Sequence, residues 1–205
     1  MLISFSKLLH KKGSEKTTML FSFDQKVALK TELKDLFISL GSLPIFMCVG
    51  VDSVIVDSLG PIVGELLKNK YMIPAYVYGD LEYNITATNL TYVKNFIDIV
   101  HSDSKILVID ASIGSAEEVG YIKLKHSGVI PAGIGKKNTK VIGDCAMLGI
   151  LLTGGIRDKI YLNEAKTKLV LDMADTIAWA ISTAILEMEQ DDIYSIVEDT
   201  EYMYI

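Results

Sequence analysis

Three short apolar runs constrain the fold of this chain more than any other feature of its sequence. They are Ile45–Val49, Ala75–Tyr78 and Ile106–Ile109, and none of them shows the apolar–polar alternation of a half-exposed strand. A strand inside a parallel sheet is buried on both faces, so its sequence is apolar throughout. Segments with helical spacing separate the runs, and strands that alternate with helices form a parallel sheet covered by helices. The sequence therefore predicts an α/β fold with these runs as neighbouring inner strands.

The first helix has a clear start and a clear end in the sequence. Ser22 and Gln25 form a capping-box pattern, and Leu29 begins an apolar series at helical spacing. Gly41 stands where a glycine ends many helices, so a helix is predicted over Asp24–Leu40. The other expected elements are helices that start near Pro61 and Thr88, strands at Val119–Lys123, Val129–Pro131 and Cys145–Leu152, and a closing helix at Lys166–Met188.

The length of 205 residues suits a single domain, and the chain shows no internal repeat and no Pro/Gly-rich linker. Residues 1–20 have no clear period and are interpreted as a loosely held lead-in. Residues 188–205 form an acidic tail, since seven acids and no Lys or Arg occur from Glu187 to the end. We interpret this tail as a frayed, solvated end, because chain termini often are.

Composition argues against several classes of partner. The net charge is -6, and no cluster of Lys and Arg is interleaved with aromatic residues, so nucleic-acid binding is not expected. The charges near the N-terminus follow the apolar residues instead of preceding them, unlike those of a secretory signal. No run reaches the roughly 18 continuous apolar residues of a membrane span. Cys48 and Cys145 are predicted to be reduced, buried thiols. We therefore expect a cytoplasmic protein without a cofactor.

Two acids are predicted at the carboxyl ends of the parallel strands, where open α/β sheets bind their ligands. Asp57 lies in the loop after the first strand, and Asp110 is the expected last residue of the third. A carboxylate at a strand end is costly unless it is hydrogen-bonded or used in function. Each acid also has a structural interpretation: Asp57 could cap a helix, and Asp110 could anchor a loop.

Several ordered motifs resemble a known family. They are Cys48–Pro61, Tyr78–Leu81, Ala87–Leu90, Ile109–Gly114, Pro131–Lys136 and Val141–Asp144. Together they resemble the YyaC-like sporulation family, a conserved domain of unknown function, over about Pro44–Gly155. That family is similar to the spore germination protease, and more remotely to the hydrogenase maturation endopeptidases.

The resemblance implies a fold and a chemistry. It implies a three-layer, phosphorylase/hydrolase-like α/β fold with a mainly parallel central sheet. The germination protease is regarded as an unusual aspartic peptidase, with essential acids in an Asp-x-Leu-Gly-Pro segment and an Ile-Asp-Ala segment. The resemblance places these two essential acids at Asp57 and Asp110 of this chain. The resemblance thus implies a sporulation-associated peptidase, acting on a protein or peptide in the cytoplasm of a forespore or mother cell if the source forms spores. It leaves the formation of a homo-oligomer open.

Five further residues are supporting candidates. Asp52 is a second candidate for the first acid, and Gly60 belongs to the same motif. Asp144, between two expected strands, is either a third acid of the site or a turn acid. Gly133 and Gly135 form either an anion-binding backbone nest or a tight turn.

The expected mechanism is general acid–base hydrolysis. Two carboxyl groups within about 3 to 5 Å cannot both ionise cheaply, so one of them holds a proton. We assign the base to Asp57 and the acid to Asp110, expect a separation of roughly 6 Å or less, and expect the like-charged neighbour to raise at least one of the two pKa values. The closing tail is a candidate to dock at this site, because Thr200–Tyr202 loosely resembles the cleavage preference of the germination protease.

Two alternatives remain open. The stretch Val51–Val54 departs from the Thr-Asp-Arg-type sequence usual in the family, and Pro131–Ala132 replaces its usual Pro-Gly, which favours a non-catalytic binding or regulatory protein. A metal-assisted endopeptidase would instead use Asp57, Asp110 and Asp144. The remote endopeptidases add a histidine to hold their metal, and this chain has no clear equivalent. Its histidines, all interpreted as surface or loop residues, are His10, His101 and His126, so no metal is expected.

Overall fold

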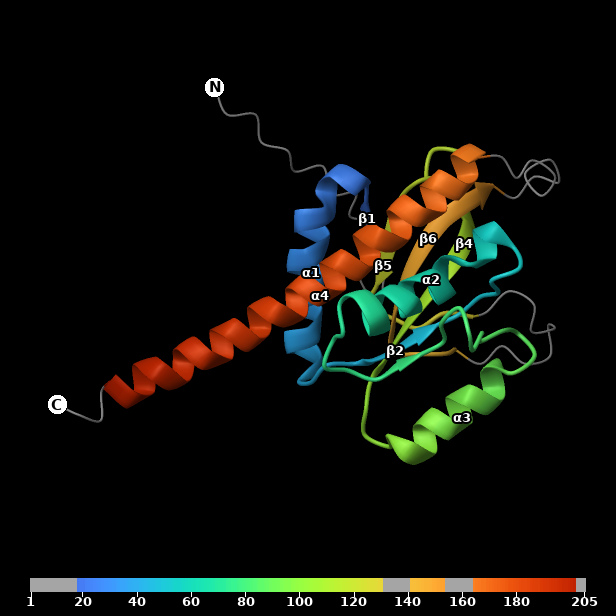
Figure 1. The fold of residues 1–205 in the computed structure, drawn as a ribbon. Helices are drawn as coiled ribbons and strands as arrows, with labels where there is room; N and C mark the ends of the chain where they lie inside the picture. The colour runs from blue at the N-terminus through green and yellow to red at the C-terminus, as the bar shows by residue number, and fades with distance from the viewer. Residues whose placement is uncertain (1–17, 131–140, 154–163, 202–205) are drawn as a thin grey trace, which may run out of the picture.

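The computed structural model describes residues 18–130, 141–153 and 164–201 (Figure 1). Six strands form a single sheet, with the order β1-β5-β6-β4-β2-β3. The strands are β1 (Thr18–Phe21), β2 (Ile45–Cys48), β3 (Val77–Tyr78), β4 (Ile106–Gly114), β5 (Ile122–Lys125) and β6 (Cys145–Thr153). The helices are α1 (Lys26–Leu40), α2 (Leu59–Glu65), α3 (Leu90–Val100) and α4 (Glu164–Glu201), with short turns η1 (Phe23–Gln25), η2 (Ile55–Asp57) and η3 (Leu66–Lys70).

The sheet is mainly parallel, as predicted. β3, β2, β4 and β6 run in the same direction, whereas β5 is antiparallel to β6 and β1 is antiparallel to β5. The three apolar runs are neighbours in the order β3-β2-β4. However, the run at Ala75–Tyr78 was wrongly expected to be an inner strand: only Val77–Tyr78 is a strand, and it lies at the edge of the sheet.

Helices cover both faces of the sheet (Figure 1). On one face, α1, α2 and α4 pack over the buried side chains Phe46, Leu107 and Met147. On the other face, α3 buries Leu90 and Ile97 against Met47 and other strand residues. This is the three-layer α/β architecture predicted from the sequence. The caps of the first helix are confirmed as well. The Ser22 N–H donates to Gln25 Oε1 at 3.0 Å, and Gly41 ends α1 with a φ of 75°.

The closing helix α4 is longer than predicted. It continues to Glu201, so the expected frayed tail from residue 188 is wrong over its described part. In Figure 1 its C-terminal end projects past α1, on the side away from the carboxyl ends of the parallel strands. The described residues therefore do not show the tail docked at the Asp57/Asp110 edge of its own chain.

By length and composition the segment Lys166–Asp191 of α4 could cross a membrane. Its apolar window is 56% buried inside the protein, and the core helix of a globular protein passes the same test. Buried residues from Val170 to Ile185 belong to the same core as α1 and α2, which agrees with the prediction of a core helix.

Four further expectations are corrected by strand pairing. β1 occupies residues that were assigned to a loose lead-in, because Thr18–Phe21 pairs with β5. β5 begins three residues later than the expected Val119. The expected strand at Val129 is only an isolated bridge to Ile142, and its last residue lies outside the described residues. The fourth correction, the end of β4, concerns the site and is described below.

Candidate active site

Asp110 lies inside β4, at the point where one of its two neighbours ends. β2 pairs with β4 only from Ile106 to Ile109, and the last contact is the Val49 N–H donating to the Ile109 carbonyl at 2.8 Å. β6 continues to pair with β4 as far as Gly114. The expectation that Asp110 ends its strand is therefore wrong, because pairing with β6 extends β4 beyond it. Asp110 is the first residue of β4 after β2 has ended.

The chain of β2 leaves the sheet at Gly50. This residue has a φ of 146°, and its N–H donates to the Ile85 carbonyl at 2.8 Å. A Cβ atom at Gly50 would lie 1.9 Å from the Asp57 carbonyl oxygen, so only glycine fits this turn. The N–H of Val51 then donates to that same Asp57 oxygen at 3.1 Å. This turn folds the loop back so that η2, which ends at Asp57, lies close to β4.

Asp57 is exposed and precedes α2. Among the described residues no hydrogen bond or ion pair involves its carboxylate, and the N-cap residue of α2 is Ser58, which makes no side-chain capping bond. The interpretation of Asp57 as a helix cap is therefore not supported. The carboxylate is free to contact solvent or a ligand.

Asp110 has a strongly shifted protonation equilibrium. Burial raises the pKa of its carboxyl from 3.8 to about 7, the Ala111 N–H that it accepts lowers it somewhat, and the charge of Asp57 raises it. The bond from Ala111 to Asp110 Oδ1 is 2.8 Å long. Ala111 is the next residue of the same strand, so this bond anchors no loop. The interpretation of Asp110 as a loop anchor is therefore not supported either.

The expected rise in pKa at one of the two acids is therefore confirmed in direction and corrected in cause. Burial contributes more than the like-charged neighbour does. The influence of Asp57 on Asp110 indicates that the fold brings both acids to one edge of the sheet. Their separation of roughly 6 Å or less stays a prediction.

Asp144 lies at the opposite end of the strands. Its carboxylate accepts the Ile106 N–H at 3.0 Å and pairs with Lys105 at 3.3 Å. Ile106 begins β4, four residues before Asp110, which is about 13 Å at the rise of an extended strand. Asp144 therefore anchors the start of β4 as a turn acid, and the structure does not bring it to the acid pair.

Other candidates are placed as follows. Asp52 is exposed in the loop after β2, where its N–H donates to Asn84 Oδ1 at 2.6 Å. Gly60 lies in α2 against β2, and a Cβ atom there would be 2.1 Å from the Val49 carbonyl oxygen. Gly60 therefore permits the close approach of α2 to β2. Gly133 and Gly135 lie outside the described residues.

The described histidines are far from the acid pair. His101 lies between α3 and β4, near the amino end of β4, and its ring contacts Tyr76 and Tyr78. His126 follows Lys125 of β5, which pairs with Ala146 close to the amino end of β6. Within the described residues no group of three or more His, Cys, Asp or Glu side chains could hold a metal ion. The residues present at the acid pair therefore do not match the three-ligand site of the remote endopeptidases.

The two cysteines are buried free thiols, as expected. Burial raises the pKa of Cys48 and of Cys145 to about 12. A thiol with that pKa is almost wholly protonated at neutral pH and is a poor nucleophile. Neither cysteine is a candidate for catalysis.

Asp80 is a buried acid whose role the sequence did not reveal. Its carboxylate pairs with Lys68 and accepts the N–H groups of Glu82 and Tyr83 at 2.9 and 2.6 Å. Burial opposes ionisation, but the hydrogen bond from Lys68 and the two N–H groups hold its pKa below the ordinary value. The signal was available, because an acid two residues after an apolar run sits at the same sheet edge as Asp110.

Asp80 fixes the loop that holds the Asp57 loop in place. The segment that follows it supplies the Asn84 side chain to Asp52 and the Ile85 carbonyl to Gly50. Asp80 is therefore a positioning residue for this edge of the sheet, and it contacts neither acid of the pair.

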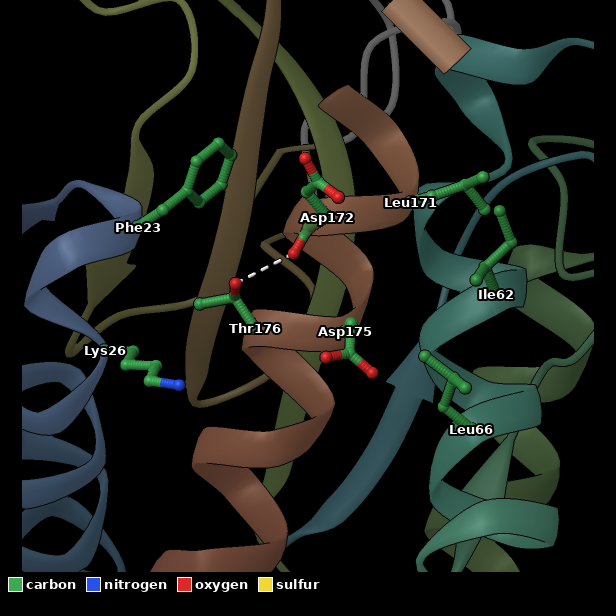
Figure 2. Close-up of a pocket in the computed structure, with 8 residues that line it drawn as sticks. All are labelled: Phe23, Lys26, Ile62, Leu66, Leu171, Asp172, Asp175 and Thr176. Atoms are coloured by element: carbon green, nitrogen blue, oxygen red, sulfur yellow. Dashed lines mark hydrogen bonds between the residues drawn. The ribbon is translucent and has the colours of Figure 1, made fainter. Parts of the chain in front are cut away.

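A hollow of about 610 Å³ lies elsewhere, between η1, α2 and α4. Figure 2 shows its lining, with Ile62 of α2 and Leu66 of η3 across from Asp172 and Asp175 of α4. The Thr176 hydroxyl in this wall donates to the Asp172 carbonyl at 2.8 Å. Neither acid of the pair lines the hollow, so it is separate from the candidate active site.

Comparisons with known proteins agree with the motifs. The chain is 29% identical over 138 residues to an uncharacterized protein, YyaC, of Bacillus subtilis (strain 168), which covers 67% of each chain. A solved structure, the [NiFe] hydrogenase maturation protease HycI from Thermococcus kodakarensis KOD1, has 18% sequence identity and a TM-score of 0.43, over 73% of this chain and 98% of that one. A family model described as "Protein of unknown function (DUF1256)" matches residues 21–180. That match extends beyond the quoted motifs at both ends and covers most of the chain, which therefore belongs to the DUF1256 family.

Proposed function

We propose that this protein is a peptidase in which Asp110 is the general acid and Asp57 the general base. The observation that carries the proposal is the Asp110 carboxyl, half-buried in a central strand, where burial raises its pKa to about 7. A general acid works best when its pKa lies near the working pH, because it then holds a proton and can still donate it. The resemblance to the germination protease independently assigns essential acids to these two positions.

The proposed reaction is a direct hydrolysis. Asp57 accepts a proton from a water molecule while the water oxygen attacks the carbonyl carbon of the substrate. Asp110 donates its proton to the amide nitrogen as the C–N bond breaks, so an amine and a carboxylic acid leave. The proton on Asp57 then returns to Asp110 through water, which restores the starting state. No covalent intermediate with the protein forms.

The metal-assisted alternative with three acids loses its support, because Asp144 lies at the other end of β4. The non-catalytic alternative is still favoured by the altered stretch Val51–Val54. We propose a protein or peptide as the partner, and the cytoplasm of a forespore or mother cell as the location if the source forms spores.

The test is cleavage of small acid-soluble spore-type proteins by purified protein. Asp57→Asn and Asp110→Asn should each abolish cleavage, because each removes one proton-transfer group while the fold stays intact. Asp144→Asn is the matched control, since it neutralises an acid at the opposite edge and should keep cleavage. Wild-type rates in either of the first two variants would refute the proposal. A wild-type protein that binds these substrates and cleaves none would support the non-catalytic alternative.

A further inference from the structure

β4 has an edge that no described strand covers. On the side of β6, pairing continues through Gly114, but on the side of β2 it stops at Ile109. Beyond that point the chain that follows β2 turns away at Gly50. The Val51 N–H donates a hydrogen bond to the Asp57 carbonyl. Within residues 18–130, 141–153 and 164–201, no strand pairs with residues 110–114 on this side.

The main-chain groups at this edge follow from the alternation along a strand. The Ile109 carbonyl faces β2, because it accepts the Val49 N–H at 2.8 Å. The Ile106 carbonyl faces β6, because it accepts the N–H of the residue before that strand at 2.8 Å. Successive residues of a parallel strand present their N–H and C=O groups to alternate sides. A register shift lies between Ser112 and Ile113, where Ser112 pairs with Ile150 and Ile113 with Leu152, so the extra residue belongs to β6 and not to β4. The alternation along β4 therefore continues, and Ala111 and Ile113 face the open edge.

Among the residues that the structure describes, only local contacts occupy these groups. The Ala111 N–H donates to Asp110 Oδ1 at 2.8 Å, and the Ile113 carbonyl has a 3.3 Å contact with the Ser112 hydroxyl. The Ile113 side chain is 55% exposed. A strand edge with unpaired N–H and C=O groups pairs readily with another extended chain, and the open edge of β4 is of this kind.

We infer that the open edge of β4 binds the substrate main chain as an added strand. The substrate is an extended segment, such as a chain terminus or an unfolded stretch, that continues the line of β2 past Gly50. Strand addition gives affinity through main-chain hydrogen bonds, so it tolerates many side chains. A segment paired with Ala111 passes directly beside Asp110. The assignment of this segment as substrate rests on the proposed function.

Two features of the edge support this assignment and limit the amino-acid composition of the bound segment. Asp57 is an exposed acid near it, and the whole chain has a net charge of -6. Like charges disfavour association, so the segment is poor in Asp and Glu. In addition, a substrate carbonyl that accepts the Ala111 N–H takes it from Asp110. The bond to Ala111 lowers the pKa of Asp110, so substrate pairing leaves the proton more firmly on the general acid.

Hydrogen exchange of single amides tests the inference without relying on cleavage. The protein is the full chain with Asp57→Asn, and the probe is a pool of random ten-residue peptides without Asp or Glu. With the probe in excess, exchange of the Ile113 amide should slow by about tenfold or more, the effect of one added hydrogen bond. The amides of Ser112 and Gly114 face β6 and serve as internal controls that should not change. An unchanged Ile113 amide would overturn the inference.

A variant pair tests the same edge kinetically. Ile113→Pro removes one outward N–H, a change that edge positions tolerate, whereas Ile113→Ala removes the side chain and keeps the N–H. For cleavage of the pool, Ile113→Pro should raise KM by about tenfold with kcat little changed, and Ile113→Ala should stay within about threefold of wild type. Equal effects of the two substitutions would overturn the inference.

Failure of this inference and failure of the proposed function give different results. Slower exchange at Ile113 without any cleavage by wild-type protein supports strand addition and overturns the peptidase. Cleavage of the pool with no change at Ile113 supports the peptidase and overturns strand addition. A protein that shows neither overturns both.

Discussion

The negative charge of Asp57 raises the pKa of the Asp110 carboxyl, although the two residues belong to different elements, η2 and β4. Burial of Asp110 is the larger cause, and the pKa reaches about 7. The stability of the protein and its proposed activity therefore depend on the same proton. This shared dependence can be measured in two independent ways.

Asp110→Asn should stabilise the protein at alkaline pH. The pKa of Asp110 is raised in the folded state, from 3.8 to about 7. Its contribution to stability is therefore complete below about pH 4 and is lost as the pH rises through about 7. Asparagine cannot ionise, so the variant avoids this loss. At about 1.4 kcal/mol per pKa unit, the gain at pH 8 should be on the order of 2–4 kcal/mol, measured by urea unfolding at pH 5 and pH 8.

Asp144→Asn is the control for that measurement. Its carboxylate holds the Ile106 N–H and pairs with Lys105, so neutralising it should cost about 1 kcal/mol at neutral pH. An Asp110→Asn variant that loses stability at pH 8 as Asp144→Asn does would contradict the burial of an unfavourable charge.

The rate of peptide cleavage should fall above neutral pH. The general acid must be protonated, and the pKa of Asp110 is about 7. Cleavage should therefore decrease by about tenfold per pH unit at pH values well above that pKa. A pH–rate profile of kcat/KM on one peptide substrate measures this limb. A rate that stays constant from pH 6 to pH 9 would show that Asp110 is not the acid.

Asp80→Asn should destabilise the protein and weaken cleavage together. The change leaves Lys68 without its buried partner and weakens the bonds from Glu82 and Tyr83, at a cost on the order of 2–3 kcal/mol. The pKa of Asp80 is lowered in the folded protein, so its contribution is complete at neutral pH and begins to decrease as the pH falls below about 4. The difference between the melting curves of wild type and variant should therefore be smaller at pH 3 than at pH 7.

A further comparison separates a positioning role of Asp80 from a general loss of stability. Lys68→Met removes the partner and leaves the Asp80 carboxylate to hold the two N–H groups. If Asp80 acts by ordering the loop that bears Asn84 and Ile85, Lys68→Met should retain more cleavage than Asp80→Asn at equal unfolded fraction. Less cleavage by Lys68→Met than by Asp80→Asn would contradict that role.

Gly60→Ala should destabilise the protein far more than Gly41→Ala. A methyl group at Gly60 would meet the Val49 carbonyl oxygen at 2.1 Å, whereas the position at Gly41 has no atom within 4 Å. Gly41 has a φ of 75°, so its substitution costs only about 1 kcal/mol of backbone strain. The close contact at Gly60 should cost several times more, because α2 must move off β2. Thermal unfolding of both variants measures the difference, and equal losses would contradict it.

The alternation of elements was readable from the sequence because burial leaves a local record. The unbroken apolar runs at Ile45–Val49 and Ile106–Ile109 predicted buried parallel strands, and both are. The capping box at Ser22 and the glycine at Gly41 predicted the ends of the first helix. These signals depend only on residues a few positions apart.

The misplaced elements depended on partners that are distant in the sequence. Thr18–Phe21 has no strong strand pattern of its own and became a strand because β5 pairs with it. The run at Ala75–Tyr78 is as apolar as an inner strand, yet no described strand lies outside it. In both cases hydrogen bonding to a distant segment decided the outcome.

The candidate site also has some features that the sequence predicts and others that only the tertiary structure decides. The order of motifs and the acids at Asp57 and Asp110 could be read from the sequence, since acids after buried strands are conspicuous. The exclusion of Asp144, the exposure of Asp57 and the partial burial of Asp110 came only from the tertiary structure. So did the open edge of β4, which exists because β2 turns away at Gly50 while β6 continues. Local sequence determines which segments form strands and where carboxylates follow them, whereas register and pairing, which depend on contacts across the whole chain, determine which carboxylates meet and in what environment.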